Sequence, residues 1–409
     1  MTDWASIRAR FPVTDRCVYL NTGWAGPASR HAVQAMQRRA EREAFDGPMT
    51  LEVHREKADL IERVRHRVAQ LVGAGDDELA LIYTTTEGMN IVARGLGLGP
   101  GDEMITCNLE HNAVMVPTYM ARLRDGIGLR IVRVRPEDDA RRIIDAFEQA
   151  ITPATRLLMF SHVAFNRGTR VPVKEIATMA HERGAFVAID AAQSAGHIDF
   201  GVREIGCDFL ALPAHKWLLA PAGAAFLYVR RDLIERLQPL AVVHGANRNY
   251  DYEGNFEAAT DTIHKFEMTT HSGPVLAGLD AALDLFDELG MREVERRCVE
   301  LASRFIDAIS GAAGVRITSP LDPALRSGIV TFTVGDLNPS ETVAALWQID
   351  RIVGRVCNDR RARLCFHVFN DETDVDRAAA AVLQLAECGL PAGAMTEAAY
   401  KEMLAESTD

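Results

Sequence analysis

Residues 185–229 read AFVAIDAAQSAGHIDFGVREIGCDFLALPAHKWLLAPAGAAFLYV, and this stretch decides the fold. It begins with an apolar run over 185–189, which is long enough for one buried strand and is preceded by Gly184. Asp190 follows the run directly. Because parallel sheets carry their ligand crevices at the carboxyl ends of the strands, we expect the Asp190 carboxylate to face a ligand.

The same stretch holds a lysine in apolar surroundings. A second apolar run over 209–212 leads into PAHKW at 213–217, whose lysine is Lys216. Lysine is rare here, with five in a total of 45 lysines and arginines. We expect desolvation between the apolar runs to lower the pKa of the Lys216 amine and to raise its nucleophilicity at neutral pH.

Asp190 and Lys216 together form the pair that pyridoxal phosphate (PLP) chemistry requires. The amine holds the cofactor as a Schiff base, and the carboxylate keeps the pyridinium nitrogen protonated, so that the ring becomes an electron sink. The alternative interpretation needs no cofactor: a strand-end aspartate, and a surface lysine whose stem lies along apolar side chains.

Three motifs extend this pair: DAAQS at 190–194, HKW at 215–217 and G-x-x-F-L-Y at 223–228. They resemble the class V aminotransferases and cysteine desulfurases, which are PLP-dependent enzymes of fold type I. The resemblance covers about residues 18–377 and is nearest to the cystine C–S lyase and isopenicillin-N-epimerase-like branches. It implies PLP as the cofactor and an amino acid as the small-molecule substrate.

The resemblance also implies an α/β fold with two domains. A large PLP-binding domain over 18–260 would hold a mostly parallel, seven-stranded sheet. A smaller α+β domain would follow over 261–409, and a helical segment over 1–17 would pack on it. The length of 409 residues and a hydrophobic content of 48% allow a core of this size. Within the large domain, charge and apolar periodicity over 31–71 predict a helix, and an apolar run predicts a strand at 131–134.

The composition limits the partners and the compartment. A net charge of −12 argues against a nucleic-acid partner, which would require a basic face. The seven cysteines are dispersed and show no CxxC spacing, which favours free thiols in a reducing cytoplasm over disulfides or a metal site. The first residues lack the apolar run of a signal peptide, and no apolar stretch reaches the roughly 20 residues that span a bilayer. We therefore expect a cytoplasmic protein with no membrane partner.

A phosphate site is expected where TTTEGMN, residues 84–90, follows the apolar run 80–83. Hydroxyl side chains at a strand-to-helix junction suit an anion, because the first N–H groups of a helix are unpaired. A plain capping box would use the same residue types. The resemblance to the family segment T-E-G/A-x-N implies that Thr85 and Thr86 bind the cofactor phosphate.

Other cofactor contacts are implied by the resemblance alone. His111, in LEHN at 109–112, would stack on the pyridine ring and take part in proton transfer near the substrate; the alternative is a solvated loop histidine. Gln193 would hydrogen-bond the ring O3′, and His215 would reach the phosphate. Pro213 stands where the family commonly has a serine or threonine on the phosphate, so that contact must be lost or replaced.

The loop SHVAFNRG at 161–168 resembles the family loop that runs beneath cofactor and substrate. It assigns Asn166 to the cofactor. Cysteine desulfurases usually carry asparagine one position earlier, where this chain has Phe165, and an aromatic residue followed by asparagine is more similar to the cystine C–S lyase branch. Arg167 is either a charge that faces the substrate or a rim residue.

Substrate contacts are expected from both ends of the chain. Asn21, Thr22 and Gly23 match a family segment at the mouth of the active site, although an ordinary exit from a strand would look the same. Arg363 matches the arginine that binds the substrate α-carboxylate, for which a guanidinium is suited because it forms two parallel hydrogen bonds. An alignment shifted slightly would give this role to one of its neighbours, Arg355, Arg360 or Arg361.

A homodimer is implied by FEMTTH at 266–271, which is similar to the family segment F-E-x-G/A-T. In the family this threonine crosses the dimer interface, so Thr270 would bind the phosphate held by the partner subunit. Met268 and Thr269 differ from the usual small residues.

The reaction follows from what surrounds the cofactor. A cysteine desulfurase needs a mobile cysteine well upstream of the carboxylate arginine, whereas Cys357 precedes Arg363 by six residues and Cys365 lies beyond it. We therefore predict a C–S β-eliminating lyase acting on cystine or a cysteine S-conjugate. An aminotransferase or an isopenicillin-N-epimerase-like racemase is the alternative, and a desulfurase comes third. A sensor or scaffold without catalysis is disfavoured, because Asp190 and Lys216 are both present.

Overall fold

The apolar runs at 185–189 and 209–212 form neighbouring central strands of a seven-stranded sheet, β6 and β7. The structure is a computed structural model that describes residues 2–357, 360–399 and 402. The strand order is β2-β8-β7-β6-β5-β3-β4, and every neighbouring pair is parallel except the two that involve β8. This confirms the expected mostly parallel sheet. The strands are β2 (Leu79–Ile82), β3 (Glu103–Cys107), β4 (Gly128–Val132), β5 (Thr155–Ser161), β6 (Phe186–Asp190), β7 (Phe209–Pro213) and β8 (Ala225–Val229).

The strand expected at 131–134 is displaced in the structure, where β4 ends at Val132. The reason lies in the side chain of Asn108, which accepts a hydrogen bond from the Val134 N–H at 2.8 Å and donates one to the Val134 carbonyl at 3.2 Å. A side chain thus takes the place of a neighbouring strand, and the ladder stops.

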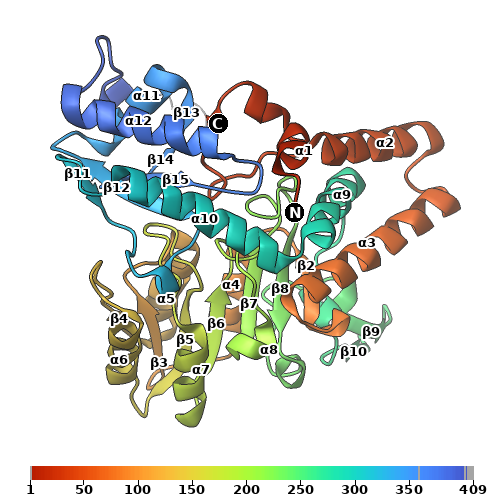
Figure 1. Cartoon of the computed structure of the whole chain (residues 1–409). Coiled ribbons are helices and arrows are strands. Elements are labelled where there is room, and N and C mark those ends of the chain that lie inside the picture. Colours follow the sequence, from red (N-terminus) through yellow and green to blue (C-terminus); the bar gives the residue numbers. More distant parts are fainter. Residues whose placement is uncertain (1, 358–359, 400–401, 403–409) are drawn as a thin grey trace.

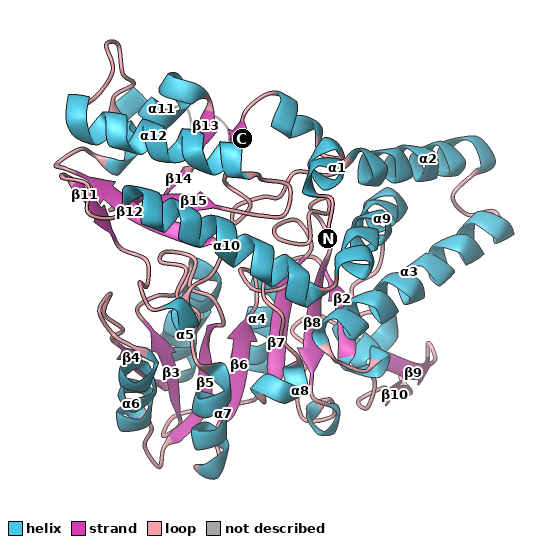
Figure 2. Cartoon of the chain, viewed as in Figure 1, coloured by secondary structure: helices cyan, strands magenta, loops and turns pink. Residues whose placement is uncertain are grey.

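Helices cover both faces of this sheet, as the cyan ribbons on either side of the magenta strands show (Figure 2). Alternate side chains of each strand enter different apolar clusters: Ile189 and Leu210 join α3, α6 and α7, whereas Ala188 and Phe209 join α4 and α5. Burial on both faces explains why the central strands read as continuous apolar runs. The helices are α3 (Leu51–Val72), α4 (Thr85–Gly95), α5 (Asn112–Asp125), α6 (Ala140–Ala150), α7 (Val173–Glu182) and the short α8 (Val202–Ile205).

A second, four-stranded antiparallel sheet lies at the upper left of Figure 1, with strand order β11-β12-β15-β14. It has its own apolar cluster, to which α10, α11 and α12 contribute, and it forms the expected smaller α+β unit. Its elements are β11 (Val315–Ile317), β12 (Ile329–Val334), β14 (Arg355–Cys357), β15 (Arg361–Cys365), α10 (Met291–Ile309), α11 (Pro339–Asp350) and α12 (Glu372–Cys388).

The N-terminal segment contacts this smaller unit. In α1 (Trp4–Ala9), Arg8 forms an ion pair with Asp374 of α12, and Trp4 lies under the guanidinium of Arg297 of α10. Further along, β1 (Val18–Tyr19) pairs in parallel with β13 (Ile352–Val353).

The helix expected over 31–71 is two helices in the structure, α2 (Arg30–Asp46) and α3. Gly47 ends α2 with a positive φ of 86°, and Pro48 follows it. A proline cannot donate the backbone hydrogen bond that would continue the helix, so the chain turns back. Both helices pack against α9 (Gly273–Leu289), where Arg67 pairs with Asp280. The domain boundary at 260/261 stays a prediction.

The segment after β8 contains an exposed antiparallel hairpin of β9 (Asn247–Tyr250) and β10 (Phe256–Ala258). Within the described part of the chain, no helix is both long and apolar enough to cross a membrane.

Candidate active site

A cavity of about 270 Å³ opens where the central strands of the large sheet end. Its walls come from both sheets and from the segment after β1, and nine of the predicted site residues lie in them. The lining consists of Gly23, Trp24, Thr84, Thr85, Thr86, His111, Ala113, Ser161, Phe165, Asp190, Ala192, Gln193, Pro213, His215, Lys216, Arg355 and Arg363.

Lys216 lies in the loop after β7, between the buried Ala214 and Trp217. Burial lowers the pKa of its amine to about 8; Asp190 opposes this shift, and the guanidiniums of Arg363 and Arg355 add to it. The amine is therefore partly unprotonated near neutral pH, which a nucleophile or base requires.

Asp190 ends β6 and is 3% exposed. Its Oδ1 accepts a hydrogen bond from the Ala192 N–H at 2.8 Å, which fixes the carboxylate at the wall of the cavity. Burial raises the pKa of Asp190, while the Lys216 charge and the Ala192 amide lower it. A carboxylate held in this way suits a protonated pyridine nitrogen as its partner.

The sequence allows two roles for the threonines at the start of α4, helix capping and phosphate binding. The structure assigns capping to Thr84 and leaves the Thr85 hydroxyl unbonded within the part of the chain that it describes. Thr84 caps the helix, because its Oγ1 accepts from the Glu87 N–H at 3.1 Å while the Glu87 carboxylate accepts from the Tyr83 N–H at 2.8 Å. Thr85 Oγ1 is buried with no hydrogen-bond partner among the described residues. A buried hydroxyl needs a partner, and a phosphate oxygen at the helix N-terminus would provide one.

His111 is the N-cap residue of α5, and its Nδ1 accepts a hydrogen bond from the Ala113 N–H at 3.2 Å. Its ring meets Phe165 edge-on, with centroids 5.1 Å apart. Burial, together with the cations of Lys216, Arg355 and Arg363, lowers the pKa of His111 to about 4. The imidazole is therefore neutral at pH 7 and suited to stacking on a ring.

A buried glutamate that the sequence motifs did not assign to the site, Glu110, precedes this histidine. Its buried carboxylate accepts hydrogen bonds from the Ser161 N–H at 2.9 Å, the Ser161 hydroxyl at 2.5 Å and the Cys107 thiol at 3.1 Å. Burial raises the pKa of Glu110 to about 7. It joins the ends of β3 and β5 under the cavity; its position next to His111 was the only signal in the sequence.

Gln193 bridges two loops of the site. Its Nε2 donates to the Gly23 carbonyl at 2.8 Å, and its Oε1 accepts from Trp217 Nε1 at 2.8 Å. One N–H of the amide remains for a cofactor oxygen. His215 lines the cavity beside Lys216, and burial lowers its pKa to about 4.

Arg363 lies on β15 with 1% of its surface exposed. Its guanidinium donates to the Phe165 carbonyl at 3.0 Å and to Asn21 Oδ1 at 3.3 Å, while Nε has no hydrogen-bond partner. Within the described part of the chain, no carboxylate forms a salt bridge with it. A buried cation is costly without a counter-charge, so this arrangement suits a carboxylate ligand.

A second arginine in the lining, Arg355 of β14, lies over the ring of Trp24 at 3.6 Å from its centroid. This cation–π contact places another guanidinium in the wall of the cavity. Trp24 was missed by the sequence analysis, because nothing in either local segment predicts that the two meet.

Four predicted site residues do not line the cavity: Asn21, Thr22, Asn166 and Thr270. Asn21 lies behind Arg363, which it hydrogen-bonds. Thr22 and Asn166 are buried, with Thr22 Oγ1 and Asn166 Oδ1 lacking hydrogen-bond partners among the described residues. Thr270 is exposed and has a positive φ of 74°, which is strained for a β-branched residue.

The chain is similar to proteins of one family. The family description "Aminotransferase class-V" matches residues 26–378. The chain is 30% identical to a protein of Methanothermobacter thermautotrophicus named "Probable cysteine desulfurase", over 83% of this chain and 84% of that one. It is also 30% identical to the isopenicillin N epimerase of Amycolatopsis lactamdurans, over 93% and 96% of the two chains.

Among solved structures, the cystine C–S lyase C-DES, in complex with its product cysteine persulfide, superposes with a TM-score of 0.84. Identity is 25%, with 91% of this chain and 99% of that chain covered. A variant of C-DES with glycine covalently linked to the PLP cofactor gives a TM-score of 0.85, also at 25% identity, over 92% and 98% of the two chains. The chain belongs to the aminotransferase class-V family, and it is a PLP-dependent enzyme of fold type I.

Proposed function

We propose that this enzyme is a C–S β-lyase that acts on cystine or on a cysteine S-conjugate. The similar proteins carry the names cysteine desulfurase, isopenicillin N epimerase and cystine C–S lyase, so the choice among their reactions depends on the residues of this chain. The surroundings of the two cysteines nearest to Arg363 support the lyase.

The cofactor contacts proposed for this chain follow the cavity wall. Asp190 would keep the ring nitrogen protonated, His111 would lie against the ring, and Gln193 would donate its remaining N–H to the ring oxygen. Thr85 and Thr86 bind the phosphate at the start of α4, with Thr85 Oγ1 gaining the partner that it lacks. When bound, PLP withdraws electrons from the substrate Cα and so acidifies the Cα proton.

The protein residues would then act as follows. Arg363, held by Asn21, binds the α-carboxylate and orients the substrate. Lys216 takes the Cα proton with its unprotonated amine, whose pKa is lowered to about 8. The Cβ–S bond breaks and its electron pair leaves on sulfur, and one water completes the release of pyruvate and ammonia. The sulfur product is a thiol, or a persulfide when the substrate is cystine.

One observation carries the choice of the lyase over the desulfurase. β14 and β15 pair with Cys357 opposite Arg361, so residues 358–360 alone connect them. Of these, 358 and 359 lie outside the described residues. Cys357 is buried with its Sγ 3.8 Å from the Phe165 carbonyl, and Cys365 is buried within β15. Neither thiol stands on a long loop that could carry sulfur away from the cavity.

Burial also raises the pKa of the Cys365 thiol, which keeps it protonated and a poor nucleophile. An aminotransferase or an isopenicillin-N-epimerase-like racemase remains the second candidate, because it would use the same cofactor residues and differ in where the proton returns. The similarity to the epimerase over nearly the whole chain favours keeping it.

Replacing Cys357 with alanine is expected to leave kcat/KM for cystine essentially unchanged, because a lyase releases its sulfur in the product. The measurement is pyruvate release by the PLP-loaded variant, together with mass spectrometry of the peptide that contains residue 357 in the unmodified enzyme after turnover. Loss of turnover in the variant, together with added sulfur on Cys357 in the unmodified enzyme, would instead indicate a desulfurase.

We also propose that the enzyme is a homodimer with shared active sites. Thr270 is exposed and strained, and it follows Thr269, whose carbonyl accepts a hydrogen bond from the Tyr83 hydroxyl at 2.8 Å. Strain in an ordered segment is typical of a functional contact. A hydroxyl outside its own cavity but next to the strand that leads to α4 fits a contact with the phosphate of a second copy.

Mixing two inactive variants tests this arrangement. Lys216→Ala and Thr270→Val subunits, unfolded and refolded together, are expected to regain activity. In each mixed dimer, the site of the Thr270→Val subunit has its own intact Lys216 and would receive an intact Thr270 from the Lys216→Ala subunit. Valine keeps the β-branched shape, so the hydroxyl alone is lost. If Thr270 acts within its own subunit, both sites of every mixed dimer are defective and no activity returns.

A cytoplasmic location is proposed as well. All seven cysteines are free thiols, and several are fully buried, which suits a reducing compartment.

A further inference from the structure

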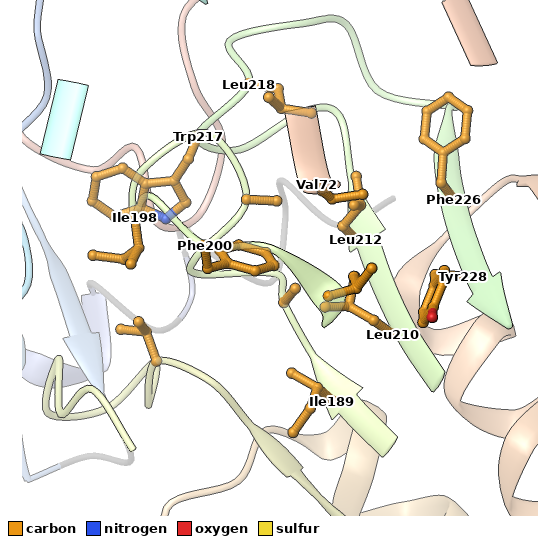
Figure 3. Close-up of a cluster of buried hydrophobic side chains, with 14 of the residues drawn as sticks. Val72, Ile189, Ile198, Phe200, Leu210, Leu212, Trp217, Leu218, Phe226 and Tyr228 are labelled. Carbon is orange, nitrogen blue, oxygen red and sulfur yellow. The ribbon is translucent and has the colours of Figure 1, made fainter. Parts of the chain in front are cut away.

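Three buried aromatic side chains, from the segments that follow β6, β7 and β15, stack on one another. The imidazole of His197 lies on the indole of Trp217 with centroids 3.7 Å apart and planes 7° apart, and His367 stacks on the same indole at 5.4 Å. All three side chains are fully buried and none lines the cavity. Figure 3 shows the indole of Trp217 beside Ile198, the residue after His197. We call these three residues the ring column.

His197 has a defined tautomer. Its Nε2 lies 2.6 Å from the Gly328 N–H, which can only donate, so Nε2 accepts. Its Nδ1 therefore carries the proton and donates to the Gln193 carbonyl at 2.8 Å. Burial lowers the pKa of His197 to about 3, which keeps the ring neutral. Both ring nitrogens are thus hydrogen-bonded, Nδ1 to Gln193 in the segment after β6 and Nε2 to Gly328 just before β12.

In His367 the two ring nitrogens have the opposite roles to those in His197. Its Nδ1 accepts from the Val368 N–H at 2.7 Å, so its Nε2 carries the proton and donates to the Trp217 carbonyl at 2.9 Å. A residue of the smaller unit therefore hydrogen-bonds the backbone of the residue next to Lys216.

The column joins the two halves of the active site. On one side, His197 and the indole N–H both bond Gln193 of the cofactor wall, and Trp217 follows Lys216 directly. On the other side, Gly328 leads into β12, in which Thr331 pairs with Arg363 of β15. The cofactor side and the carboxylate side are connected through it.

Two glycines allow this close packing. Gly196 has a positive φ of 84°, and a Cβ there would lie 2.6 Å from the Trp217 carbonyl group. A Cβ on Gly328 would lie 2.6 Å from the Phe366 carbonyl oxygen and 2.8 Å from His197 Nε2. All three distances are too short for any side chain, so only glycine at these two positions allows the rings and the backbone to pack this closely.

We propose that His197 is a positioning residue, which through Gly328 and Trp217 sets the distance between the Lys216 side of the site and the Arg363 side. This inference rests on one part of the proposed function: a substrate amino acid contacts both the Lys216 side and the Arg363 side of the site. A ligand that needs only the cofactor side would not depend on His197, whereas an α-amino acid would.

The test uses a pair of ligands that differ by one carboxylate: methionine, whose sulfur is one carbon too far for β-elimination, and 3-(methylthio)propylamine. Each is titrated into the PLP-loaded full-length enzyme, and its Kd is read from the visible absorbance. His197→Phe keeps the ring stack and removes both hydrogen bonds. We expect it to weaken methionine binding by about tenfold or more, the effect typical of an unpaired buried donor, and to leave amine binding unchanged.

His197→Gln is the matched control, because its side-chain oxygen can reach the position of Nε2 and accept from the Gly328 N–H. It is expected to restore most of the methionine affinity. Equal weakening of both ligands, or equal behaviour of the two variants, would overturn the proposal and leave His197 a structural residue.

If His197→Phe fails to fold, His367→Phe tests the same coupling from the smaller unit, since it keeps the stack and removes the bond to the Trp217 carbonyl. The same split between methionine and the amine is expected, and its absence contradicts the proposal.

A failure of the proposed function would give a different result from a failure of this proposal. If the enzyme does not bind amino acids, methionine would leave the absorbance of the unmodified enzyme unchanged, and both the proposed function and the positioning role of His197 would be wrong. Pyruvate release plays no part, so an epimerase reaction would leave this test valid.

Discussion

Replacing Lys216 with alanine is expected to abolish turnover while leaving PLP binding intact. Asp190, His111 and Thr85 would still surround the cofactor, but no amine would remain to take the Cα proton. A positioned general base typically contributes about 10²–10⁴-fold to the rate, so the loss should be at least of this order. The measurement is pyruvate release from cystine, together with the visible spectrum of the PLP-loaded variant.

Lys265→Ala is the matched control for this variant. Lys265 is also a buried lysine, but it lies outside the cavity and donates to the Thr260 carbonyl at 2.8 Å. It is expected to retain turnover even if its stability falls. Appreciable steady-state activity in Lys216→Ala would contradict the mechanism, because it would mean that another group removes the proton.

Replacing Arg363 with methionine is expected to raise KM sharply with a smaller effect on kcat. Methionine fills part of the same space but cannot bind a carboxylate. Removing one partner of a buried charge pair costs about 2 kcal/mol or more, so KM should rise by about 30-fold or more. Steady-state kinetics on cystine and on one S-conjugate measure this increase.

Two further variants identify the anchor. Arg361 lies two residues before Arg363 on β15, is absent from the cavity wall, and donates to the Asn166 carbonyl at 3.3 Å. Arg361→Met should therefore leave KM near its original value. Arg355→Met tests the other guanidinium in the wall. A large rise in KM for Arg355→Met with none for Arg363→Met would assign the carboxylate to Arg355.

The central strands of the large sheet could be predicted from the sequence because they are buried on both faces. Runs such as 185–189 and 209–212 are then apolar throughout, and each leads directly to a residue of the cavity wall, Asp190 after the first and Pro213 after the second. The break between α2 and α3 also had a local signal in Gly47 and Pro48, but the helical periodicity on both sides concealed it.

The residues of the candidate site also fall into those that a local sequence pattern predicts and those that it does not. Residues within contiguous motifs, such as Thr85, Asp190 and Lys216, could be placed through their resemblance to a family, and they meet in the cavity. The contact between Trp24 and Arg355 depends on long-range packing that no local pattern encodes.

The ring column was missed for the same reason. His197, Trp217 and His367 come from three separate segments, and only the packed structure brings their rings together.

The threonines at the start of α4 show a further limit of prediction from sequence. Capping and phosphate binding call for the same residue types, and hydrogen bonds to particular atoms are needed to assign Thr84 to one role and free Thr85 for the other.

The most direct test of the central claim is pyruvate release by the purified, PLP-loaded enzyme, from cystine and a panel of cysteine S-conjugates, with no keto acid added. Continuous release over many turnovers is the predicted result, and the relative rates would rank the substrates. If the cofactor instead loses its visible absorbance once, as its pyridoxamine form accumulates, and recovers only when a keto acid is added, the enzyme is an aminotransferase and the lyase assignment is wrong.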